Sequence, residues 1–121
     1  MYLRNMPGHH DLEAWKAARA VSAGVLRMSR DSWKPHLAAV FSQLQRSSLS
    51  AQLNISEGYA SGPGHRCRYL LEVAYGSAVE TDDLLQLLAA ERDTPTAEIA
   101  EALEQCRQAQ RLLKGLIRRY R

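Results

Sequence analysis

The strongest chemical signal in the sequence is a run of basic side chains near its end. Between residues 107 and 121 there are six bases and no acid. Five of the six follow one another at spacings of four, three, four and three, which places them on one face of a helix. The guanidinium group makes planar, paired contacts to phosphate and carboxylate, so this basic stripe predicts binding to RNA, DNA or an acidic protein. Its members are Arg107, Arg111, Lys114, Arg118, Arg119 and Arg121.

A structural explanation of the stripe remains open. Residues 72–104 carry nine acids and a single base, Arg92, so acids come early and bases late in the last predicted helix. That order suits the helix dipole, and the same bases could pair with acids of a neighbouring subunit. No aromatic residues alternate with the bases, which argues against a platform that stacks single-stranded bases.

A second polar cluster lies in the middle of the chain. Arg46, Asn54 and Glu57 share one face of a predicted helix, and Glu80 of the following helix could face them. Polar groups near a core must be paired, so we expect a structural network that fixes the helix register. The alternative is an active site, but no activated nucleophile or base accompanies the cluster.

The sequence carries no recognisable catalytic, metal or cofactor motif. Glu80 and Asp83 are three residues apart, a spacing that some α-helical pyrophosphohydrolases use to hold magnesium, so a small metal-dependent phosphohydrolase stays an alternative. The histidines do not repeat at ligand spacings, and phosphate-loop, dinucleotide and nucleophile-elbow motifs are missing. We therefore predict a non-enzymatic protein with no catalytic residue, bound metal or cofactor.

Composition predicts one globular domain. The chain has 121 residues, of which 45% are hydrophobic and 24% charged, with a net charge of +3. No apolar run reaches the roughly 18–20 residues of a membrane span, and the start lacks the apolar region of a signal peptide. Cys67 and Cys106 lie in helical patterns and read as reduced core thiols, which indicates a cytoplasmic protein without a membrane partner.

Four amphipathic segments must position these residues, and we expect helices over residues 11–30, 36–57, 65–91 and 96–120. Asp11 should cap the first helix, and Thr94 or Thr96 the last. Gly58 should follow the end of the second helix, and Gly76 should let a neighbouring helix come close to the third.

Short turns between long helices favour neighbours that run in opposite directions. The predicted fold is all-α, an antiparallel up-down-up-down four-helix bundle over residues 11–121, with residues 1–10 as a flexible N-terminal arm. The third helix should bury a heptad of residues. That heptad comprises Cys67, Leu70, Ala74, Ser77, Thr81, Leu84 and Leu88.

Three blocks of the chain carry a family resemblance. Residues 43–58 read QLQRSSLSAQLNISEG, residues 69–80 read YLLEVAYGSAVE and residues 11–17 read DLEAWKA. Together they resemble the 23S rRNA intervening-sequence protein family. The residues of the first block that match the family pattern are Gln43, Leu44, Arg46, Ser50, Asn54, Ile55, Glu57 and Gly58.

The resemblance implies a cytoplasmic four-helix bundle that assembles as a ring-shaped homopentamer. A related branch consists of accessory proteins of diversity-generating retroelements, which bind a reverse transcriptase and nucleic acid. Self-association is also expected from the number of large aromatic residues, because a bundle of this size cannot bury them all. Those residues are Trp33, Phe41, Tyr59, Tyr69 and Tyr75.

Overall fold

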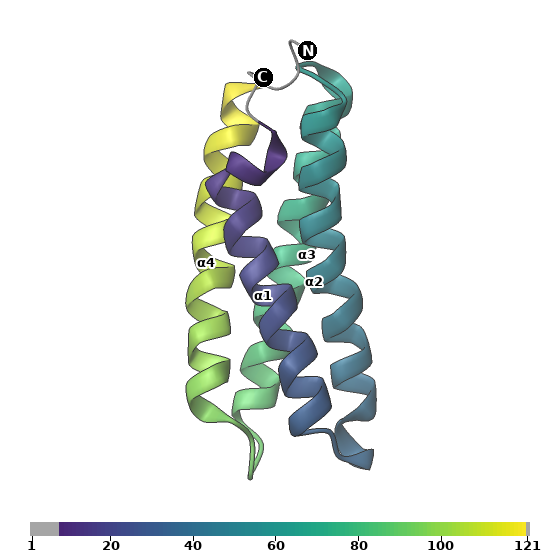
Figure 1. The fold of residues 1–121 in the computed structure, drawn as a ribbon, viewed down its shortest axis with the longest axis vertical. Coiled ribbons are helices and arrows are strands. Elements are labelled where there is room, and N and C mark those ends of the chain that lie inside the picture. Colours follow the sequence, from purple (N-terminus) through teal and green to yellow (C-terminus); the bar gives the residue numbers. More distant parts are fainter. Residues whose placement is uncertain (1–7, 121) are drawn as a thin grey trace.

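Four α-helices make up the described part of the chain, as the sequence predicts. The computed structural model describes residues 8–120, and within that range it contains no β-strand. Two short 3-10 turns, η2 (His9–Asp11) and η3 (Pro35–Leu37), precede the first and second helices. The all-α class is therefore confirmed (Figure 1). The helices are α1 (Glu13–Asp31), α2 (Ala38–Ala60), α3 (His65–Ala89) and α4 (Thr96–Arg119).

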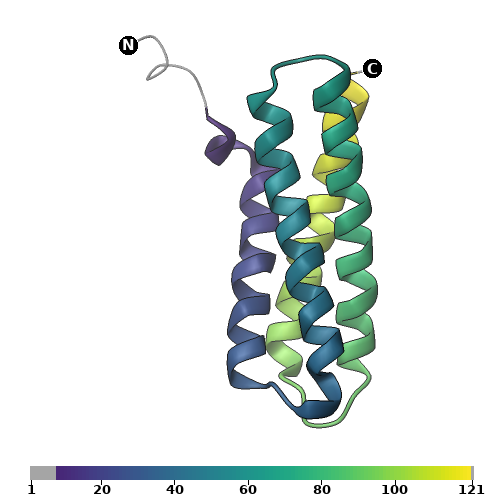
Figure 2. The same ribbon diagram turned by 90° about the vertical axis from the view of Figure 1, so that its right-hand side faces the viewer.

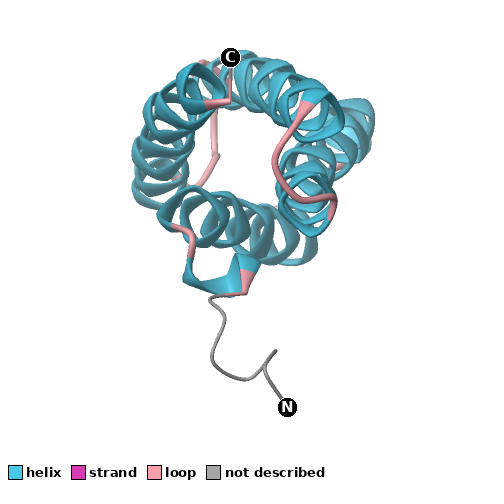
Figure 3. Cartoon of the chain, turned by 90° about the horizontal axis from the view of Figure 1, so that it is seen from above, coloured by secondary structure: helices cyan, strands magenta, loops and turns pink. Residues whose placement is uncertain are grey.

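The helices lie side by side around a common long axis. The α2–α3 connection lies at the same end of the molecule as the start of α1 and the end of α4 (Figures 1 and 2). The α1–α2 and α3–α4 connections lie at the opposite end. Seen from above, each helix has a neighbour on either side, with α1 closing the circle against α4 (Figure 3).

The core between the helices combines large and small side chains. Val25, Met28, Phe41, Leu44 and Ile55 are almost completely buried. The predicted heptad of α3 faces this core: Ser77 and Leu84 are half-buried, and its other five members are buried. Both thiols are free and buried, as predicted.

Two predicted helix caps are wrong. Helix α1 begins after Leu12 rather than Asp11, and the Leu12 side chain makes no capping hydrogen bond. Helix α4 follows Pro95, whose rigid ring suits a helix start but which offers no side-chain acceptor. The Thr94 hydroxyl instead donates a hydrogen bond back to the Glu91 carbonyl at 3.1 Å.

The roles predicted for two glycines are also wrong. Gly58 does not end α2, which continues to Ala60; it is buried where α2 meets α3. A Cβ atom at Gly58 would lie 3.4 Å from both the Cys67 carbonyl oxygen and the Leu70 Cβ. Gly76, by contrast, is exposed, and a Cβ atom there would meet nothing within 4 Å. The close helix approach that we assigned to Gly76 is made at Gly58.

Residues 1–7 of the predicted arm lie outside the described residues. So does Arg121, one of the predicted binding residues. In the remainder of the arm, the rings of His9 and His10 pack nearly perpendicular to the Trp15 indole, at centroid distances of 5.3 and 4.7 Å. Within residues 8–120, no helix is both long and apolar enough to cross a membrane.

Candidate polyanion-binding surface

The second half of α4 presents the basic stripe to solvent. Arg107, Arg111, Lys114 and Arg118 follow the helical repeat along one flank of α4, and all four are exposed. Arg119 is also exposed but lies off this line, one residue after Arg118. The helix holds these side chains at fixed spacings, because its opposite face is anchored in the core by Cys106, Ala109 and Leu113.

Arg107 is tied to the protein by a partly buried carboxylate. Its Nε lies 3.2 Å from Oδ2 of Asp82 on α3, and Gln110 donates to the same oxygen at 2.9 Å. Gln86 donates to Oδ1 of Asp82 at 2.6 Å. Burial alone would raise the pKa of Asp82, but these three donors outweigh it, so the pKa lies below its ordinary value. Arg107 therefore has a structural partner in the folded chain.

Lys114 and Arg111 have weaker, uncharged partners. The Lys114 ammonium lies 5.4 Å from the centroid of the Tyr75 ring on α3, a cation–π contact that leaves its charge uncompensated. Arg111 donates to the Gln108 side chain one turn earlier on α4, at 2.5 Å. Both cations stay accessible to an incoming anion.

Arg118 and Arg119 make no ion pair with any acid among residues 8–120. The part of the chain that the structure describes contains four ion pairs, and only one of them involves the stripe. The stripe thus retains positive charge that no acid of residues 8–120 neutralises. The four pairs are Lys16–Glu13, Arg30–Asp31, Arg68–Glu72 and Arg107–Asp82.

The four residues of the predicted polar network are not joined by any hydrogen bond within residues 8–120. Arg46 and Glu57 are exposed, and neither side chain has a hydrogen-bonding partner there. The Asn54 amide donates to Ser50 of its own helix, to the carbonyl at 2.8 Å and the hydroxyl at 3.2 Å. Glu80 accepts a hydrogen bond from Gln43 of α2 at 2.7 Å.

Small hydroxyls form a further polar contact between α2 and α3, which the sequence reasoning missed. Thr81 donates to the Ser47 hydroxyl at 2.8 Å, and the Ser50 and Ser77 hydroxyls are 2.8 Å apart. The sequence did contain a signal for this contact. Ser77 and Thr81 belong to the predicted heptad, and Ser47 and Ser50 lie about one helical turn apart. Their partners were not evident, because helix spacing does not say which faces meet.

The carboxylate pair considered for magnesium lies at the surface. Glu80 and Asp83 are exposed, and Glu80 is engaged by Gln43. Among residues 8–120, no three histidine, cysteine, aspartate or glutamate side chains are placed to hold a metal ion. Burial raises the pKa of the Cys106 thiol to about 11, which makes it a poor nucleophile at neutral pH.

The large aromatic residues divide between core and surface. Phe41 is buried, whereas Trp33 and Tyr69 are 53% and 64% exposed. Tyr75 is half-buried beneath Lys114. The expectation that a single chain leaves some of these rings uncovered is met at Trp33 and Tyr69.

A comparison with protein families decides where the chain belongs. The model of the 23S rRNA-intervening sequence proteins matches residues 10–115, which is most of the chain. The chain belongs to this family. The 23S rRNA-intervening sequence protein match includes the first three bases of the stripe and ends before Arg118. Among curated proteins, none matches the chain.

Proposed function

We propose that this 23S rRNA-intervening sequence protein is a non-enzymatic, cytoplasmic homo-oligomer that binds the phosphate backbone of nucleic acid through its basic stripe. We further propose an antiparallel up-down-up-down topology. Contacts between α2 and α3 support it, because Gln43 meets Glu80 while Gly58 meets Leu70: numbers that rise along α2 fall along α3. The positions of the connections in Figure 1 agree.

The uncompensated charge of the stripe carries the binding proposal. Of the bases of the stripe, only Arg107 has a carboxylate partner among the described residues, while Lys114, Arg118 and Arg119 are exposed and lack one. A stripe whose role was to stabilise the folded chain would face acids across the α3–α4 contact. The bases instead leave their charges in water, where released counterions can drive binding to a polyanion.

The length of the stripe suits a nucleic-acid backbone. From Arg107 to Arg118 it extends over about 16 Å, at roughly 1.5 Å per helical residue. A duplex carries one charge for about every 1.7 Å of its axis, so phosphates are available to every base of the stripe. The binding we propose is therefore sensitive to salt and indifferent to sequence, and RNA and DNA are both acceptable ligands.

Salt-titrated fluorescence anisotropy with a labelled RNA duplex tests the proposal. The variant Lys114→Gln/Arg118→Gln removes two bases that lack an acidic partner among the described residues. The variant Arg30→Gln/Arg92→Gln removes the same charge outside the stripe, at the end of α1 and in the α3–α4 connection. We expect the first variant to bind more weakly and to reduce the slope of log K against log salt by up to about two. The control variant should lose much less affinity.

Two results would contradict the proposal: affinity that does not change with salt, or equal losses in the two double variants. Competition with poly-glutamate provides a further discrimination. If poly-glutamate displaces the RNA at equal charge concentration, the surface selects for charge alone and an acidic protein becomes the better ligand.

A further inference from the structure

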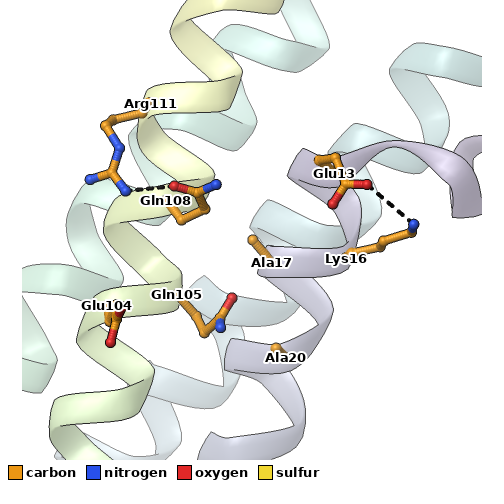
Figure 4. Close-up of a pocket in the computed structure, with 8 residues that line it drawn as sticks. All are labelled: Glu13, Lys16, Ala17, Ala20, Glu104, Gln105, Gln108 and Arg111. Atoms are coloured by element: carbon orange, nitrogen blue, oxygen red, sulfur yellow. Dashed lines mark hydrogen bonds and ion pairs between the residues drawn. The ribbon is translucent and has the colours of Figure 1, made fainter.

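The surface between α1 and α4 is hollowed over much of its length. One hollow of about 560 Å³ lies between Glu13, Lys16 and Ala17 of α1 and residues 104–111 of α4. Figure 4 shows its two walls, with Ala17 and Ala20 on one side and Gln105 and Gln108 on the other. A second hollow, of about 570 Å³, continues from Arg19 to Asp31 along α1. Together we call them the α1–α4 groove.

Small residues of α1 form one side of this groove. Ala17, Ala20, Ala23 and Gly24 line the two hollows, so α1 leaves room where larger side chains would fill it. The side formed by α4 is polar and carries acids in its first half, at Glu98, Glu101 and Glu104. The bases Arg19 and Arg27 of α1 line the second hollow together with Asp31, whereas Lys16 and Arg111 line the first hollow, nearer the end of α4.

The outer face of α2 is a ridge with complementary features. Leu49 and Leu53 lie one turn apart on it and are 39% and 53% exposed. Arg46 precedes them by one turn and Glu57 follows by one turn, and neither side chain has a hydrogen-bonding partner among the described residues. The ridge therefore presents, in order, a base, two leucines and an acid.

The heights of these groups along the bundle axis match. Ser22 of α1 donates to the Ser48 carbonyl of α2 at 3.1 Å, which sets the two residues at one level. Counting in opposite directions from that bond places Arg46 level with Gly24, and Glu57 level with Glu13. Gly24 and Glu101 of α4 both line the second hollow. Glu13, Lys16 and Arg111 all line the first hollow.

We propose that the α2 ridge of one copy occupies the α1–α4 groove of the next copy, with no shift along the axis. Arg46 then faces Glu101, and Leu49 and Leu53 lie over Ala20 and its neighbours. Glu57 meets the end of the first hollow, where the two bases Lys16 and Arg111 outnumber the acid Glu13. This inference rests on the homo-oligomer of the proposed function and names its interface. A ridge and a groove are different surfaces, so the contact is heterologous and either closes into a ring or polymerises. Neighbouring copies in a cyclic ring are related by rotation without a shift along the axis. The charges of the ridge and the groove match in this unshifted register.

Charge also selects the orientation of the neighbouring copy. An inverted copy would place Arg46 beside Lys16 and Glu57 beside Glu101, and both pairs would repel. The interface covers Arg111, which lines the first hollow, but it leaves Arg107 and Lys114 free, because they lie on the side of α4 that contacts α3. Assembly would therefore repeat these two bases of the stripe around the ring.

Charge reversal with rescue tests the interface, read by sedimentation velocity. Arg46→Glu and Glu101→Arg should each raise the concentration needed for assembly at least about tenfold, since each sets like charges together. Combining them restores opposite charges and should restore assembly. Arg92→Glu makes the same change in charge outside the groove and ridge, and should assemble like the unmodified chain.

Both altered residues are exposed, so the variants should keep the helical far-UV spectrum and melting temperature of an unassembled bundle. Leu53→Gln offers a second test without a change of charge, and it should also weaken assembly. The interface would be overturned if neither single charge reversal weakened assembly, or if the double variant did not restore the assembly that the single variants lose. Either outcome would leave homo-oligomerisation intact. An unmodified chain that is a monomer at high micromolar concentration would overturn both. RNA binding is measured separately with Lys114→Gln/Arg118→Gln, because neither of these residues lines the two hollows.

Discussion

The α2–α3 and α1–α4 contacts both use small residues, but to opposite effect. Between α2 and α3, Gly58 is covered by Leu70 and Leu71, and Ser47 and Thr81 are buried and bonded to each other. Between α1 and α4, Ala20 and its small neighbours border open hollows. A small side chain lets two helices come together when its partner is complementary, and otherwise leaves a space. The first surface is therefore complete within one chain, whereas the second leaves its small residues uncovered.

The largest effect should come from filling the closed contact. Gly58→Val adds three carbon atoms where a single Cβ already lies 3.4 Å from the backbone of α3. We expect a loss of about 1–3 kcal/mol in the free energy of unfolding, from overpacking. Urea denaturation in an Arg46→Glu background measures it without a contribution from assembly. An unchanged midpoint would show that α2 and α3 can separate freely, and would remove the contrast between the two faces.

The α3–α4 contact lies between these extremes, because a charge rather than a set of hydroxyls fixes it. Asp82→Asn should lower the free energy of unfolding at pH 7 by about 1–2 kcal/mol, since the charged acceptor of three donors is lost. The folded pKa of Asp82 is depressed, so its stabilisation is complete above the unfolded value of about 3.9 and disappears as pH falls through the lower folded pKa.

Denaturation of both proteins between pH 7 and pH 2 measures this dependence. The stability difference between Asp82→Asn and the unmodified chain should shrink in the acid range below about pH 4. A difference that stays constant down to pH 2 would mean that the Asp82 charge contributes nothing and that only its shape matters.

The smallest effect should come from the open face. Gly24→Ala places a Cβ whose nearest neighbour is the end of the flexible Arg27 side chain at 3.8 Å. We expect a gain of about 0.5–1 kcal/mol from helix propensity, in the same Arg46→Glu background. The matched glycine pair thus separates the two faces by the sign of the change. A loss of stability at Gly24 would show that the α1–α4 groove is already packed in the single chain.

Helix existence and core composition were predictable because both depend on the spacing of apolar residues along one segment. Thus Cys67, Ala74 and Leu88 are buried as their heptad predicts. The basic stripe was predictable for the same reason. The spacing of its bases places them on one face of α4, and the apolar residues on another face of that helix imply that the bases are exposed. The pairing of Arg107 with Asp82, 25 residues earlier, did not follow, because it depends on how α3 and α4 are rotated about their axes.

The sequence by itself determined four amphipathic helices, two buried thiols and a line of bases on the last helix, since each is a local periodic property. Tertiary structure alone decided that Gly58 rather than Gly76 lies at a close helix contact, that Arg46 and Glu57 face outward, and that α1 and α4 leave a groove. The physical reason is that a helical repeat fixes which residues share a face. The neighbour that each face meets is fixed only when side chains of different helices pack together.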